Sequence, residues 1–138
     1  MKSKNLRTVA ASALVTTALS LSIGGFATVS LRDSQIRTVD DQLQKIADSV
    51  RANPDSPVSS ALDAASEEDF NITIALVSGR KLTVINESKL ELTSAPKNRL
   101  LNLSVSSPIT VTGSENFRLL TQVISGGDRL IFLSLIHI

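Results

Sequence analysis

Cysteine is absent from the 138 residues, and histidine occurs once, at His137. The chain can therefore form no disulfide framework, no cysteine-ligated zinc site, no thiol nucleophile and no Ser-His-Asp triad around an internal histidine. Tryptophan and tyrosine are also absent, and aromatic residues make up only 3% of the chain. Little is left from which to build a base-stacking surface or an aromatic sugar-binding cleft.

An excess of basic charge is missing as well. The chain has 14 Lys and Arg against 13 Asp and Glu, a formal net charge of +1, which argues against a nucleic-acid partner. No group of titratable residues resembles a nucleophile, a general base or a metal site. The sequence therefore predicts no catalytic, cofactor-binding or metal-binding residue in this chain.

Charged residues are distributed unevenly, and residues 8–31 contain none. As a helix this run would be about 36 Å long, enough to cross a hydrocarbon core of roughly 30 Å. The basic residues within residues 1–7 predict, by the positive-inside rule, a cytoplasmic tail and an extracytoplasmic location for the rest. We therefore expect a transmembrane helix over residues 8–31 of a single-pass protein of the cell membrane. The alternative is a cleavable signal peptide, because Gly25-Phe26-Ala27 offers small residues for cleavage.

Residues 32–53 carry an apolar stripe whose members are separated alternately by three and four residues, the pattern of one helix face. The stripe consists of Ile36, Val39, Leu43, Ile46 and Val50. We take these residues as a candidate seam for dimerisation and signalling. Two interpretations are open, because the stripe can bind a second copy or pack against the chain's own sheet. Prolines at positions 54 and 57 predict the end of this helix.

The segment after this helix, residues 54–132, is predicted to form a short helix followed mainly by antiparallel strands. Residues 70–77 alternate between large apolar and smaller or polar side chains, and a turn at residues 78–81 joins them to a second strand. A second hairpin is indicated by Gly126-Gly127, which suits a tight reversal. The remaining expected elements are helices over residues 58–66 and 96–103 and strands over residues 82–85, 109–112, 117–124 and 130–133.

This order of elements resembles the N-terminal part of bacterial, particularly actinobacterial, two-component sensor histidine kinases. Val39-Asp40-Asp41-Gln42-Leu43 is similar to the VD-x-x-L start of the membrane-proximal helix in that family. The strands over residues 74–84 and 117–131 resemble the PAS-like sensor sheet of the family. The expected fold class is therefore α+β, with one N-terminal transmembrane helix, a membrane-proximal signalling helix over residues 32–53 and a mainly antiparallel PAS-like sensor domain over residues 54–132.

The resemblance implies that the chain is the sensor part of a membrane histidine kinase. It would detect an extracytoplasmic signal and transmit it to a cytoplasmic autophosphorylating domain that is missing here. ATP and Mg are implied for that kinase domain and no cofactor for this fragment. The implied partners are the membrane, a second copy in a homodimer and a cognate response regulator. The alternative is a membrane-anchored or secreted small binding module with no kinase.

The last six residues, 133–138, read Leu-Ser-Leu-Ile-His-Ile. They correspond to the codons CTG TCT CTT ATA CAC ATC, which match the mosaic end of a transposase sequencing adapter. We expect these residues, His137 included, to be an adapter-derived artefact at the cut end of a gene. The alternative is that the six residues complete a strand, which their composition permits.

Overall fold

The structure, a computed structural model, describes residues 29–67, 70–86, 94–112 and 115–136, apart from the side chains of residues 94–97. Residues 29–52 are helical and are called the long helix below. The chain divides after Gln35 into two units, and the fold described here is that of the second, Ile36–Ile138. The other elements are α2 (Pro57–Glu67), β1 (Thr73–Ser78), β2 (Lys81–Val84), α3 (Ser94–Asn102), β3 (Ile109–Thr112), β4 (Asn116–Val123), a 3-10 turn (Ser125–Gly127) and β5 (Arg129–Ile136).

The strands form one antiparallel sheet in the order β2-β1-β5-β4-β3. Both predicted hairpins are confirmed, with Ser78 opposite Lys81 in one and Val123 opposite Arg129 in the other. The pairing of β1 with β5 joins the two hairpins and places β5 at the centre of the sheet. Because side chains alternate along a strand, this central strand contributes to an apolar core on each face.

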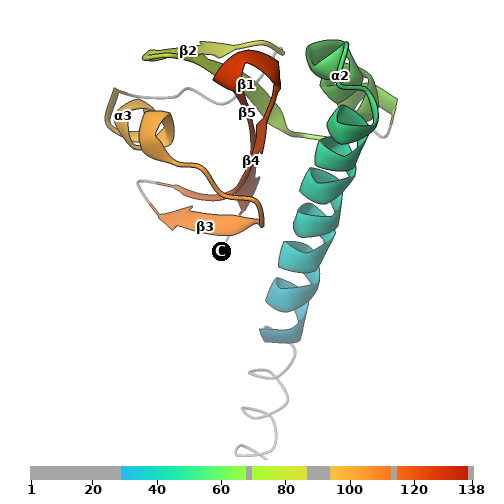
Figure 1. The fold of residues 1–138 in the computed structure, drawn as a ribbon. Helices are drawn as coiled ribbons and strands as arrows, with labels where there is room; N and C mark the ends of the chain where they lie inside the picture. Colours follow the sequence, from blue (N-terminus) through green and yellow to red (C-terminus); the bar gives the residue numbers. More distant parts are fainter. Residues whose placement is uncertain (1–28, 68–69, 87–93, 113–114, 137–138) are drawn as a thin grey trace, which may run out of the picture. The chain divides into compact units, whose positions relative to one another are not determined.

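The two faces of the sheet are covered by different helices (Figure 1). The long helix and α2 pack on one face, where Ile74, Leu120 and Phe132 are completely buried. Helix α3 packs on the other face, where Leu119 and Ile131 are completely buried. The predicted helices over residues 32–53, 58–66 and 96–103 are confirmed, with ends shifted by at most three residues.

The long helix ends where the proline pattern predicts it. Residue 52 is its last helical residue, and Pro54 offers no backbone N–H for another helical turn. Asn53 caps the end, because its backbone N–H donates to the Val50 carbonyl at 3.2 Å and its side-chain amide donates to the Ser49 carbonyl at 3.0 Å. These bonds satisfy two of the carbonyl groups that a helix C-terminus leaves without an intrahelical partner.

The expected fold class and localisation need a correction. Among the described helices, none combines the length and the apolar character needed to cross a membrane, which contradicts the single-pass membrane protein expected above. The physical reason is that charged residues recur along the long helix from Arg32 to Arg51, while α2 and α3, with 11 and 9 residues, are shorter than the roughly 20 residues a span requires. Residues 8–28 of the expected span lie outside the described residues.

Residues 133–136, which we expected to derive from an adapter, form the last part of β5. Leu133 pairs with Thr73 on one side and Leu119 on the other, and Ser134 and Ile136 are buried. The structure therefore places these residues in a strand, while residues 137–138 lie outside the described part of the chain. The origin of the six residues stays a prediction.

Thr121 connects β4 to the segment before β3 and gives a first testable prediction. Its hydroxyl accepts from the Val105 N–H at 2.7 Å and donates to the Val105 carbonyl at 2.9 Å, and its side chain is buried. Thr121→Val keeps the shape but removes both bonds, so we expect a loss of about 1–3 kcal/mol in unfolding free energy, measured by urea denaturation. The matched change Thr83→Val, at an exposed position of edge strand β2, should stay within about 0.5 kcal/mol. Equal losses in both variants would contradict the assignment.

Candidate functional site

The five candidate seam residues lie on the long helix, mostly against the sheet. Leu43, Ile46 and Val50 are buried in the core between helix and sheet. Val39 is partly buried against that core, and Ile36 is half-buried. The stripe therefore packs inside the chain, which is one of the two interpretations that the pattern left open. Its part in binding a second copy stays a prediction.

An ion pair between Asp40 and Arg118 joins the long helix to β4. The Arg118 Nε donates to Asp40 Oδ1 at 2.7 Å, and its Nη2 donates to Asp40 Oδ2 at 2.5 Å. These two bonds form the fork-to-fork arrangement that fixes the orientation of a guanidinium against a carboxylate. Only 14% of the Arg118 side chain and 28% of the Asp40 side chain are exposed. The pair is therefore shielded from solvent far better than an ordinary surface pair.

The same guanidinium reaches the edge of the sheet. Its Nη1 donates to the Thr110 hydroxyl of β3 at 2.8 Å, and its Nη2 also donates to the Pro108 carbonyl at 3.1 Å. We call Asp40, Pro108, Thr110 and Arg118 the Arg118 cluster. A single side chain thus ties the long helix to β4, to β3 and to the segment that leads into β3.

A second polar link lies near the end of the long helix. The Arg51 Nε donates to Gln122 Oε1 at 2.9 Å, and Arg51 also forms an exposed ion pair with Asp48. Arg118 and Gln122 are four residues apart on β4 and therefore point to the same face. Leu120 lies between them in the apolar core against the helix. The contact between helix and sheet is thus apolar in its middle and polar at two points along β4.

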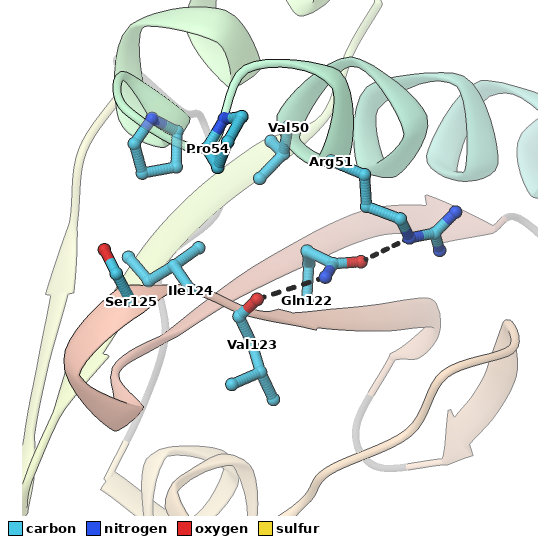
Figure 2. Close-up of a pocket in the computed structure, with 8 residues that line it drawn as sticks. Val50, Arg51, Pro54, Gln122, Val123, Ile124 and Ser125 are labelled. Carbon is cyan, nitrogen blue, oxygen red and sulfur yellow. Dashed lines mark hydrogen bonds between the residues drawn. The ribbon is translucent and has the colours of Figure 1, made fainter.

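A pocket of about 120 Å³ lies beside this second link (Figure 2). Its walls come from the end of the long helix, the loop that leads into α2, and the end of β4 with the turn that follows. The apolar lining residues are Val50, Pro54, Pro57, Val123 and Ile124, and the polar ones are Arg51, Gln122 and Ser125. The Gln122 amide has a fixed orientation, because its Nε2 donates to the Val123 carbonyl at 3.1 Å while its Oε1 accepts from Arg51.

The sequence did not predict the pairing of Asp40 with Arg118, although both residues lie in the segments that carry the resemblance. A signal was present in each segment. Asp40 follows Val39 and lies one helical turn before Leu43, so it borders the apolar stripe. Arg118 shares a strand face with Leu120. Opposite charges at the edges of two surfaces that must pack together indicate an ion pair, but only after the helix has been assigned to that strand.

Comparisons of the chain with protein-family models, with curated proteins and with solved structures gave no match. Its function is therefore inferred from the geometry. Within the described ranges, no group of three or more Asp, Glu or His residues could hold a metal ion. What the described residues offer is a small apolar pocket at one end of a helix-to-sheet contact and a shielded ion pair nearer its other end.

Proposed function

We propose that the chain is the sensor part of a two-component histidine kinase whose autophosphorylating domain is encoded outside this sequence. The observation that carries the proposal is the Arg118 cluster, in which one strand of the sheet is fixed to a long helix through a shielded, bidentate ion pair. A sensor must couple a binding surface to an element that leads away from it, and this cluster supplies such a coupling.

The arrangement of the strands also supports the proposal. Neighbouring strands in the order β2-β1-β5-β4-β3 are all antiparallel, and the resemblance implies a mainly antiparallel sensor sheet. The helix that precedes β1 in the chain packs on one face of the sheet, and α3, between β2 and β3, packs on the other.

Strand β4 is the element through which a signal would pass. Its residues Leu119 and Thr121 contact the α3 side, whereas Arg118, Leu120 and Gln122 contact the long helix. A ligand that binds one packing of this strand more tightly than another would shift the equilibrium between them. Because the helix is held at two polar points, the shift would move it as a unit, by the 1–2 Å typical of helix shifts at interfaces. In the whole kinase the helix would act within a homodimer.

The proposal also assigns chemistry to the domain outside this sequence. That domain would bind ATP and Mg, phosphorylate itself on histidine and pass the phosphoryl group to a cognate response regulator. A second candidate is a small binding module without a kinase. The pocket beside Arg51 and Gln122 favours it, because a pocket can serve binding without any transmission.

Autophosphorylation of the full-length protein tests the sensor function. A long read across the locus, downstream of the codons for residues 117–132, should show a frame that continues into a histidine-phosphotransfer and an ATP-binding domain. In that protein Asp40→Asn should change the rate of autophosphorylation with ATP and Mg about fivefold or more, because it uncouples the helix from β4. Asp48→Asn, at the exposed pair with Arg51, is the matched control and should leave the rate unchanged. A reading frame that ends without kinase domains would overturn the proposal. Equal autophosphorylation rates in the unaltered protein, Asp40→Asn and Asp48→Asn would also overturn it.

A further inference from the structure

We propose that the pocket beside Arg51 and Gln122 binds a small, uncharged aliphatic molecule of four or five non-hydrogen atoms that carries one hydroxyl or carbonyl group. The inference names a ligand class for a site at the helix-to-sheet contact. Binding itself does not depend on the kinase, and only its use as a signal rests on the function proposed above.

The size of the pocket sets the size of the ligand. Its volume of about 120 Å³ is somewhat smaller than the roughly 150 Å³ of an apolar protein cavity that binds benzene. It exceeds the space of a single water molecule, whose share of liquid volume is about 30 Å³. A branched chain of three or four carbons with one polar atom fits within this volume, whereas a sugar, a nucleotide or an aromatic amino acid would extend beyond it.

The lining sets the polarity of the ligand. Val50, Pro54, Pro57 and Ile124 present aliphatic carbon, and prolines add rigid walls that lose little entropy when a ligand is bound. The oxygen and the nitrogen of the Gln122 amide already have hydrogen-bond partners in the chain, so the amide forms part of the pocket wall and needs no hydrogen bond from the ligand. The Ser125 hydroxyl lies at the exposed rim, where a single polar group of the ligand can meet both this hydroxyl and water.

The charges around the pocket argue against an anion. Arg51 is the cation that lines it, but its guanidinium is paired with Asp48 and donates to Gln122. The pocket also lies at the C-terminal end of the long helix, where the helix dipole places partial negative charge. A carboxylate or phosphate would therefore meet a cation that already has a carboxylate partner, next to the negative end of the helix dipole. A cation, in turn, would lose its hydration against a mostly aliphatic lining.

A titration of the uniformly labelled 138-residue chain with isobutanol, followed by amide NMR, tests the proposal. The signals of residues 50–51 and 122–125 should move in a saturable way, with half-saturation at about 1–10 mM, the range open to so small a ligand. Isobutyrate, which has the same branched carbon skeleton and a charge, should bind at least about tenfold more weakly. Shifts that rise linearly and spread over the whole chain would overturn the proposal, and so would tighter binding of isobutyrate.

Two variants make the test specific to the pocket. Ser125→Leu places a larger side chain at the rim and should abolish the saturable shifts, whereas Ser106→Leu, at an exposed serine that does not line the pocket, should leave them unchanged. Ile124→Ala enlarges the pocket and should shift the preference from isobutanol to cyclohexanol. Unchanged binding in Ser125→Leu would overturn the proposal while leaving the kinase function untouched, because autophosphorylation and its dependence on Asp40 are measured separately.

Discussion

Leu43→Ala is expected to lower the free energy of unfolding of the chain by about 3 kcal/mol, within a range of roughly 2–5 kcal/mol. Leu43 is completely buried between the long helix and the sheet, in the same core as Leu120, Leu130 and Phe132. Removing its side chain reduces the apolar area that is buried and leaves a cavity. The helix and the strands cannot close this cavity, because the Arg118 cluster and the bond between Arg51 and Gln122 hold them in place. Urea denaturation followed by circular dichroism measures the loss.

Ile36→Ala is the matched control on the same stripe. Ile36 lies seven residues before Leu43 and is only half-buried, so its truncation should lower the unfolding free energy by less than about 1 kcal/mol. For each variant, the urea concentration at the unfolding midpoint should stay the same when the protein concentration is raised tenfold, because the stripe is packed within one chain. A midpoint that rises with protein concentration would instead assign the stripe to a contact between two copies. Similar losses for both variants would contradict the packing described here.

The parts of this fold that depend on local pattern could be predicted from the sequence. The spacing of apolar residues by three and four predicted the long helix, and Pro54 predicted its end. The alternation of side chains in residues 70–77 predicted β1. Gly126 and Gly127 gave the reversal between β4 and β5, because both adopt a left-handed backbone with φ of 85° and 83° that other residues enter only with strain. Each of these signals is carried by residues that are close in sequence.

The parts that depend on distant pairing could not be predicted. The pairing of β1 with β5 joins residues 73–77 to residues 129–133, and no turn residue marks it. The choice between the two roles of the stripe depended on that sheet, since only an assembled sheet offers the helix a surface to cover. The pocket has the same origin, because its walls come from segments around positions 50 and 123 that meet only after helix and strand have packed.

Arg118→Ala should lower the unfolding free energy by about 2–4 kcal/mol, although the residue lies on a strand that the helix already covers. The change leaves the Asp40 carboxylate without its cation at a position where 28% of the side chain is exposed, and it removes the donors to Thr110 and Pro108. Loss of one partner of a shielded pair is strongly destabilising, because the other charge stays desolvated. Asp48→Asn, whose pair with Arg51 has 59% and 44% of its side chains exposed, should change the stability by less than about 0.5 kcal/mol.

A double-mutant cycle with Asp40→Asn separates the ion pair from the other roles of Arg118. If the two charges interact as the geometry indicates, the double variant should be more stable than the sum of the single losses predicts, by about 1–2 kcal/mol. The remaining loss then belongs to the bonds to Thr110 and Pro108. This coupling should persist at 1 M NaCl, because a pair with little exposure is screened less than a surface pair. Additive losses would show that Asp40 and Arg118 stabilise the fold independently, and the helix would then be held to β4 by its apolar contacts and by Arg51 alone.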